Sequence, residues 1–260
     1  MNNEHTEFMD IDGPEFIYDV NKEIKNMRER VHDSFHNVDI FNSKETTKQE
    51  IELDCYAEIA VLDTNFLISK LGYLDAVLDL ANKHPYSLLV ILPWIVIKEL
   101  DGLKNGRKDV ALSSRNAMRF IELRLRDKQI SLKGQKKNEI LDTTLLKNSR
   151  AKGDDLILDC CMYFQRLTQD KARMFPGNGS CRITLLSNDR NLCIKAMVHD
   201  VNTISADSTL EMEDLLNRIV LKKSLNTTSS NSLQQNEDHV MQKLLNFVLY
   251  IYISSKPLLS

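Results

Sequence analysis

Short runs of apolar residues alternate with helical patterns through the middle of the chain. The apolar runs lie at 57–63, 87–92, 182–186 and 201–204. Apolar residues at helical spacing follow them, over 71–83, 94–103, 110–128, 154–167 and 191–198. Strands that are apolar on both faces and alternate with helices are typical of a mainly parallel sheet covered on both sides. The pattern therefore predicts an α/β fold with three layers, in which a central sheet lies between helices.

The segments that flank this pattern have a different character. An amphipathic helical pattern occupies 18–35, between polar neighbours, and a stretch rich in Ser, Thr, Asn and Gln follows the last predicted strand. The apolar run 244–253 has about half of the ~20 residues that a membrane helix needs, so we expect it to pack on a protein surface or to begin a further domain. We predict an acidic arm, a folded domain, a polar linker and an apolar segment, at 1–54, 55–221, 222–236 and 237–260.

Composition narrows the class of protein. A chain that is 42% hydrophobic and 27% charged, with a mean hydropathy of −0.31, is typical of a globular protein and excludes wholesale disorder. The five cysteines form no C-x-x-C pair, which favours a reducing compartment over a disulfide framework or a zinc cluster. The first twenty residues contain no Lys or Arg, so we expect neither a secretory signal nor a basic transit peptide. These features indicate a nuclear or cytosolic protein without a membrane span.

Charge is unevenly distributed along the chain. Residues 1–54 hold 6 basic and 14 acidic side chains, whereas residues 104–152 hold 14 basic and 5 acidic ones. A long positive segment in a slightly acidic protein is the pattern expected for a polyanion partner, although a solvated helix face with a Lys-rich loop explains it equally well. We interpret 104–152 as an insertion or a binding surface rather than core. The basic residues that we expect to bind nucleic acid are Arg115, Arg119, Lys133, Lys136 and Lys137.

Acidic side chains occur where several predicted strands end. Asp63 follows the first strand, Glu99 lies on the helix after the second, and Asp189 follows a later strand. Ligands of open parallel sheets bind beyond the carboxyl ends of the strands, so these acids are expected at one edge. Each has a plainer explanation, since Asp caps helices and forms turns, and a Glu at the boundary of an amphipathic helix is usually solvated.

A fourth acidic position is the doublet Asp154–Asp155, which opens a predicted helix. One of the two can cap the helix, and we assign Asp154 to the cap and Asp155 to the site, with Asp159 one turn further as a structural residue. Carboxylates that converge without a cation repel one another. Oxygen ligands without an accompanying His or Cys set suit Mg²⁺ or Mn²⁺, which could orient a water against a phosphodiester while the basic stretch holds the nucleic acid.

Four motifs, VLDTNFL, VIKEL, GDDLIL and LLSNDRNL, resemble those of PIN-domain nucleases in order and context, over roughly residues 55–220. The resemblance implies metal-dependent hydrolysis of single-stranded RNA that leaves a 5′-phosphate, with Mg²⁺ or Mn²⁺ held by Asp63, Glu99, Asp155 and Asp189. Asp154 is the alternative ligand, because the doublet leaves the register open by one residue. Asn65 and Ser187 match small polar positions beside such sites.

The residues of these motifs resemble those of eukaryotic RNA-quality-control endonucleases more than those of small bacterial toxins. In particular, they are similar to those of a transcription-associated nuclear endoribonuclease of fungi. This implies a nuclear protein, with cytoplasmic residence left open, that acts in RNA quality control beside the transcription or mRNA-export machinery. The alternative is a catalytically inactive PIN-like scaffold that binds RNA or protein. No phosphate-binding or dinucleotide-binding glycine motif is present, so we expect no small-molecule cofactor, and we interpret Trp94 as core packing.

Overall fold

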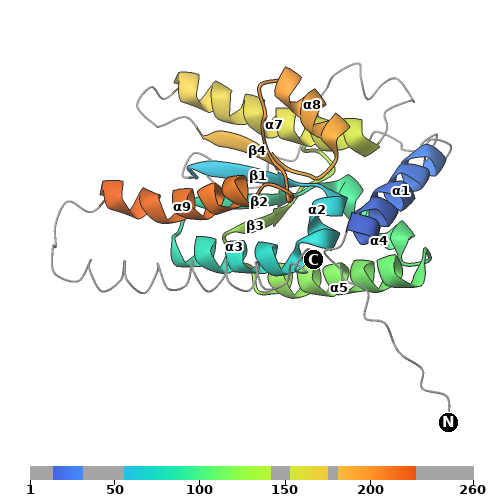
Figure 1. Ribbon diagram of the computed structural model, residues 1–260. Helices are drawn as coiled ribbons and strands as arrows, with labels where there is room; N and C mark the ends of the chain where they lie inside the picture. The colour runs from blue at the N-terminus through green and yellow to red at the C-terminus, as the bar shows by residue number, and fades with distance from the viewer. Residues whose placement is uncertain (1–13, 32–55, 142–152, 175–180, 227–260) are drawn as a thin grey trace, which may run out of the picture.

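The computed structural model describes residues 14–31, 56–141, 153–174 and 181–226 of the chain. Its centre is a sheet of parallel strands in the order β3-β2-β1-β4-β5 (Figure 1). The strands are β1 (Glu58–Leu62), β2 (Leu88–Leu92), β3 (Leu132–Gly134), β4 (Arg182–Leu186) and β5 (Asn202–Ile204). All four pairings between them are parallel, so the predicted parallel sheet is confirmed.

Helices cover both faces of this sheet, which confirms the predicted three-layer α/β/α architecture. One layer consists of α7 (Gly153–Met174) and α8 (Arg190–Val198), which contact β1, β4 and β5. The other contains α3 (Leu71–Lys83), α5 (Lys108–Arg126) and α9 (Thr209–Asn226), with α3 against β2 and α9, and α5 against β3 (Figure 1). Two further helices, α2 (Thr64–Ser69) and α4 (Trp94–Leu103), begin where β1 and β2 end.

The central strands have the composition that burial on both faces requires. Every residue of β1 and β2 is buried, and these strands consist almost entirely of Ile, Leu, Val and Ala. The one acid among them, Glu58, accepts hydrogen bonds from Thr184 and from the guanidinium of Arg218. Because Arg218 lies on α9, this ion pair ties the last described helix to the middle of the sheet. The sheet is thus a rigid support for the loops at its carboxyl edge.

The described part of the basic stretch, residues 104–141, belongs to the body of the fold, contrary to its interpretation as an insertion. Strand β3 extends the sheet beside β2, and α5 buries Val110, Ala117 and Ile121 against the core. The many charged residues of α5 lie on its outer face and obscure this apolar stripe in a charge count. A three-residue strand at the edge of a sheet also gives too short a pattern to be recognised in the sequence.

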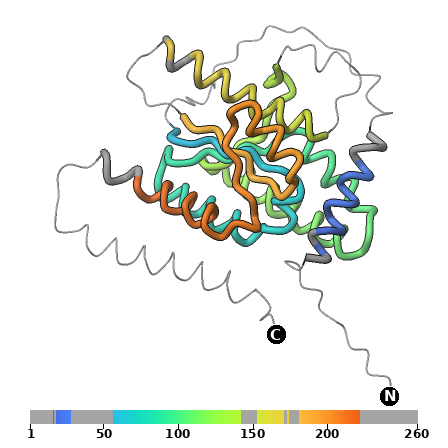
Figure 2. The backbone as a smooth tube through the Cα atoms, turned by 45° about the horizontal axis from the view of Figure 1, so that its top comes forward, coloured from blue at the N-terminus to red at the C-terminus, as the bar shows by residue number. Residues whose placement is uncertain are grey.

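The first helix packs on the same hydrophobic core. Helix α1 runs over Pro14–Val31, about a turn earlier than the predicted 18–35, because Pro is well suited to the first turn of a helix. Its side chains Phe16, Val20 and Ile24 are buried. The helix packs against α2 and α4, beside the carboxyl ends of the strands (Figure 2). The rest of the expected arm lies outside the described residues.

The end of the domain also differs from the expectation. Helix α9 was not foreseen, and it continues to Asn226, inside the range predicted as a linker from residue 222. The remaining linker and the apolar segment 237–260 lie outside the described residues. Among the helices that the structure describes, none combines the length and apolar character needed to cross a bilayer.

Candidate functional site

The carboxyl edge of the sheet brings Asp63 and Glu99 to either side of Thr64. Asp63 ends β1 and caps α2, and its Oδ1 accepts a hydrogen bond from the backbone N–H of Thr64 at 2.6 Å. The hydroxyl of Thr64 donates to Oε2 of Glu99 at 2.5 Å. Glu99 is 2% exposed, so the expectation of a boundary position on α4 was wrong. The two acids are therefore joined through one residue, although 36 positions separate them in the sequence.

The end of β4 contributes a third acid to the same edge. Leu186 is paired with Leu62, so the residues that follow β4 lie beside Asp63. The hydroxyl of Ser187 donates to Oδ2 of Asp63 at 2.6 Å, and the backbone N–H of Asp189 donates to that same hydroxyl at 3.0 Å. Asp189 caps α8 by accepting hydrogen bonds from the N–H groups at 191 and 192. The capping role that the sequence allowed and a place beside the site are thus both realised.

A network of amides holds these loops in place. Asn65 accepts a hydrogen bond from the backbone N–H of Asn188 at 3.1 Å and donates one to Asn21 of α1 at 3.1 Å. Asn188 in turn donates to Ser69 and accepts from the N–H of Ala206. The small polar residues after β1 and β4 therefore connect the site to α1, α2 and the start of the segment after β5. Asn21 is part of this hydrogen-bond network, and the sequence did not predict it. Its contact with Asn65 depends on where α1 packs.

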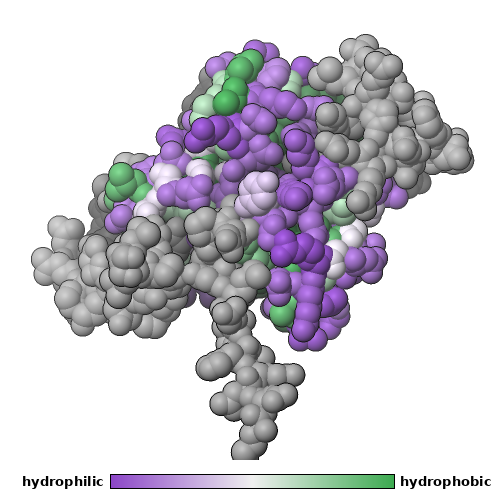
Figure 3. Space-filling model, turned by 45° about the vertical axis from the view of Figure 1, so that its right-hand side comes forward, coloured by the Kyte–Doolittle hydropathy of each residue, from purple (hydrophilic) through white to green (hydrophobic). Residues whose placement is uncertain are grey.

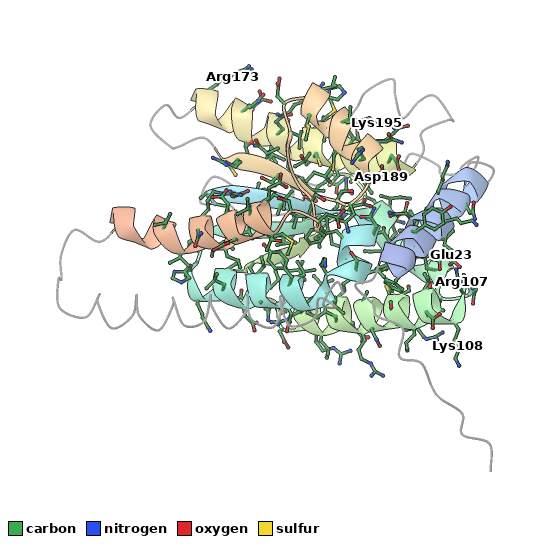
Figure 4. The ribbon with its side chains drawn as sticks, in the orientation of Figure 1. Glu23, Arg107, Lys108, Arg173, Asp189 and Lys195 are labelled. Atoms are coloured by element: carbon green, nitrogen blue, oxygen red, sulfur yellow. The ribbon has the colours of Figure 1, made fainter. Side chains whose placement is uncertain are left out.

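The acidic doublet at the start of α7 faces Lys195 of α8. The Lys195 ammonium lies 2.8 Å from Oδ1 of Asp155 and 4.0 Å from Oδ2 of Asp154 (Figure 4). Asp154 has the more buried side chain, 18% exposed against 44% for Asp155. It also lies three and seven residues before Ile157 and Cys161, which face the core. Burial and helical phase thus favour Asp154 over Asp155 as the acid of the doublet that faces the core, while the place of the doublet in the site remains a prediction.

Asp159 has the structural role that was expected of it. Its carboxylate accepts a hydrogen bond from the backbone N–H of Leu141 at 3.3 Å, which anchors the end of the segment after β3. Burial raises the pKa of this carboxyl, while the Leu141 hydrogen bond and the charge of Arg166 act in the opposite direction. Burial also raises the pKa of the Cys193 thiol to about 11, with the negative charges of Asp63 and Asp189 adding to the effect.

The carboxylate donors match a hard divalent cation in chemistry. Asp63, Glu99, Asp189 and the doublet supply oxygen atoms, and the neighbouring hydroxyls of Thr64 and Ser187 are oxygen donors as well. Across the described residues, however, no three Asp, Glu, His or Cys side chains lie close enough together to hold an ion as they stand. The chemistry of these oxygen donors fits Mg²⁺ or Mn²⁺. That the carboxylates of Asp63, Glu99, Asp189 and the doublet meet around one ion remains a prediction.

The predicted RNA-binding residues fall into two groups. Arg115 and Arg119 are exposed on α5, and Lys136 and Lys137 are exposed after β3. Lys133 instead forms an ion pair with Glu139 at 2.6 Å, in which each side chain is 13% exposed. Its ammonium also lies 5.4 Å from the centre of the Phe164 ring. Lys133 is therefore engaged within the protein, whereas the other four cations face outward.

Trp94 does not pack in the core as expected. Its residue is 39% exposed at the start of α4, where the backbone N–H donates to Oε1 of Gln135 at 3.0 Å. The Lys137 ammonium lies 5.2 Å from the centre of the indole ring. The prediction failed because Pro93 and Trp94 directly follow a buried strand. The sequence alone does not show that the chain leaves the core between these two residues.

Comparison with known proteins identifies the family. A family model described as the PIN domain matches residues 60–207, more than half of the chain. The chain belongs to the PIN-domain family. PIN domains are generally nucleases that use divalent metals, and the matched residues include Asp63, Glu99, the doublet and Asp189. The predicted family is therefore confirmed, and it supports a nuclease.

Three curated relatives resemble this PIN domain. Transcriptional protein swt1 of Schizosaccharomyces pombe is 37% identical over 157 residues, which cover 60% of this chain and 30% of that protein. Transcriptional protein SWT1 of Saccharomyces cerevisiae is 34% identical over 160 residues, 56% of this chain and 31% of that protein. Telomerase-binding protein EST1A of Danio rerio is 28% identical over 180 residues, 60% of this chain and 11% of that protein. The similarity thus spans less than a third of each relative's length.

Proposed function

We propose that the protein is a divalent-metal-dependent endoribonuclease that hydrolyses phosphodiester bonds of single-stranded RNA. The observation that carries this proposal is the connection of Asp63 and Glu99 through Thr64, at the same edge of the sheet where Asp189 follows β4. Membership of the PIN-domain family supports a nuclease, and the exposed cations at 115, 119, 136 and 137 offer contacts for phosphates.

Each acid has a distinct part in this proposal. Asp63 and Glu99 are the central ligands, because they are the most deeply buried and each is fixed by a short hydrogen bond. Asp189 and one member of the doublet, Asp154 or Asp155, complete the set. A bound Mg²⁺ or Mn²⁺ would orient a water for attack on phosphorus and offset the negative charge that builds up on the phosphate. The protein's own hydroxyls, on Thr64 and Ser187, hold the two central carboxylates in position.

The names of the relatives support a proposal for the cellular role. Two of them are called transcriptional proteins, so we propose that the substrate is RNA made in the nucleus, and that the protein acts in RNA quality control near the transcription or mRNA-export machinery. This location and these partners go beyond the domain match, because the chain covers only about a third of those proteins.

Cleavage of an end-labelled single-stranded RNA with Mn²⁺ tests the proposed activity. We expect Asp63→Asn to lower the rate by at least about 100-fold, since even partners of metal ligands commonly cost 10- to 100-fold. Asp170→Asn, at an exposed position on α7, is the matched control and should cut like the parent. If the parent and Asp63→Asn cut equally, this site does not carry the activity. If the parent binds RNA without cutting it under any divalent metal, the inactive scaffold is the better description.

A further inference from the structure

An exposed aromatic side chain stands at the same edge of the sheet as Asp63, and it has no part in the proposed nuclease site. Trp94 begins α4 immediately after β2, the strand that neighbours β1. Glu99 lies five residues further along the same helix, a rise on the order of 8 Å along its axis, but its side chain is buried whereas Trp94 is exposed. The described surface in Figure 3 is mainly hydrophilic, and Trp94 is one of the large hydrophobic side chains that are exposed in the structure. An indole combines a large apolar face with a polar edge, so an exposed tryptophan offers a contact surface for a ligand.

The backbone beneath the indole is firmly held. Gln135 is 8% exposed, and it accepts a hydrogen bond from the N–H of Trp94 while its own amide donates to the backbone oxygen of Glu139 at 2.7 Å. Glu139 also accepts from the backbone N–H of Lys136 at 2.9 Å and pairs with Lys133. These contacts fix the segment after β3 against the start of α4. The backbone that carries Trp94 and Lys137 therefore has little conformational freedom to lose on binding.

The order of the strands sets the place of this pair relative to the acids. Along the carboxyl edge, the segment with Lys136 and Lys137 follows β3, Trp94 follows β2, Asp63 follows β1 and Asp189 follows β4. Neighbouring strands are about 5 Å apart, so the backbone at Trp94 follows the strand next to that of Asp63, and the backbone at Lys137 follows the strand after that. An extended polynucleotide whose backbone passes the acids would thus meet the indole and then the ammonium.

We propose that Trp94 is a stacking platform for one base of single-stranded RNA and that Lys137 binds the phosphate beside that base. The proposal deepens the proposed nuclease function, and rests on it for the identity of the ligand. An indole face stacks on any base, while a lysine whose ammonium lies over the ring can turn to a phosphate without a change of backbone. This subsite would hold the strand in register with the acids and would favour unpaired over duplex RNA, whose bases are already stacked.

The fluorescence of Trp94 can report on stacking directly, because it is the only tryptophan of the chain. The full chain is titrated with a 12-nucleotide oligoadenylate in EDTA, where binding can be followed without cleavage. We expect the fluorescence to be quenched with the same midpoint as the anisotropy of labelled RNA. Trp94→Leu should weaken binding roughly tenfold at an unchanged salt slope, since stacking is not ionic, and Trp94→Phe should recover most of the affinity.

Two lysines provide a matched pair for the phosphate contact. Lys136→Gln and Lys137→Gln remove the same charge from adjacent exposed positions, but only Lys137 lies over the ring. We expect both variants to flatten the salt slope. Only Lys137→Gln should also alter the amplitude of the fluorescence quenching. Thermal melting of each variant shows whether it is folded.

The outcomes separate this inference from the nuclease proposal. Saturable quenching without cleavage in Mn²⁺ supports stacking and contradicts the nuclease. Cleavage by the parent, combined with unchanged fluorescence and parent-like affinity of Trp94→Leu, overturns the stacking platform and leaves the nuclease intact. Failure of the RNA to bind in EDTA also overturns it.

Discussion

Thr64 donates its hydroxyl to Glu99 across 2.5 Å, while its backbone N–H holds Asp63. A single residue at the first turn of α2 thereby sets the relative position of two acids that follow different strands along the chain. Both acids are buried, so their orientation depends on these contacts more than it would at a solvated surface. The polar residue after an acid at a strand end is therefore part of the site and not merely a turn former.

The first prediction concerns this hydroxyl. Thr64→Val keeps the shape of the side chain but removes the donor to Glu99, and we expect the cleavage rate to fall by roughly 10- to 100-fold. We also expect a loss of about 1–3 kcal/mol in the free energy of unfolding, because the buried carboxylate of Glu99 loses a hydrogen-bond donor. Thr64→Ser restores the hydroxyl and should behave nearly as the parent. Urea unfolding and cleavage of labelled RNA measure the two effects, and a Val variant with parent activity would remove Thr64 from the site.

The second prediction distinguishes the two acids of the doublet. Asp154 is more buried than Asp155 and shares the inward stripe of α7, so we expect Asp154→Asn to reduce cleavage much more than Asp155→Asn. Both variants remove one charge next to Lys195, which makes each the control for the other. Mn²⁺ affinity, measured by calorimetry, should follow the same order. A larger loss for Asp155→Asn would restore the assignment that the sequence suggested.

The third prediction separates exposed from engaged cations. Charge reversal at Arg115, Arg119 and Lys136 should weaken RNA binding and flatten the dependence of affinity on salt, by about one unit of slope for each phosphate that the protein no longer binds. Lys133→Gln should leave that slope almost unchanged and lower the urea midpoint instead, because its partner Glu139 is left in a largely buried position. Fluorescence anisotropy at several salt concentrations gives the slopes. Equal slopes for the parent and the triple reversal would place RNA elsewhere.

The fourth prediction concerns α1. Ile24 is 2% exposed in the common core, and Ile24→Ala should cost about 2–5 kcal/mol of unfolding free energy. Exposed Lys25 on the same helix provides the control, since Lys25→Ala should change stability little. Nearby, Asp19 pairs with Arg107, and Glu23 accepts a hydrogen bond from the Arg107 backbone N–H (Figure 4). If Ile24→Ala unfolds at the parent urea concentration, α1 contributes nothing to the domain's stability.

The fifth prediction is a dependence of stability on pH. Burial raises the pKa of Asp159, so the folded state holds the proton more tightly than the unfolded chain, and ionisation costs stability as the pH rises above the ordinary value for Asp. Asp159→Asn should therefore stabilise the protein at pH 7, since an amide oxygen can still accept from Leu141. The gain should shrink as the pH falls toward the ordinary pKa of Asp, below which the side chain is protonated in both states. Urea unfolding between pH 4 and 7 measures it, with Asp170→Asn as the exposed control.

The sequence determined the layers of this fold because its central strands are apolar throughout. Strands β1, β2 and β4 can be buried only between two helical layers, and the helices between them carry clear apolar stripes. The order of the four acidic motifs was likewise visible, since three of them stand at the end of a strand or the start of a helix and Glu99 lies on the helix that follows the second strand. These are local properties, and local spacing is sufficient to reveal them.

Only the tertiary structure decided which side chains meet. Whether Glu99 is buried or solvated, which acid of the doublet faces inward, and whether Trp94 and Lys133 point outward all depend on packing between distant segments. Short β3 and the docking of α1 escaped prediction for the same reason, because their partners come from elsewhere in the chain. Periodicity assigns a residue to an element, whereas its surroundings are fixed by the free energy of packing the whole domain.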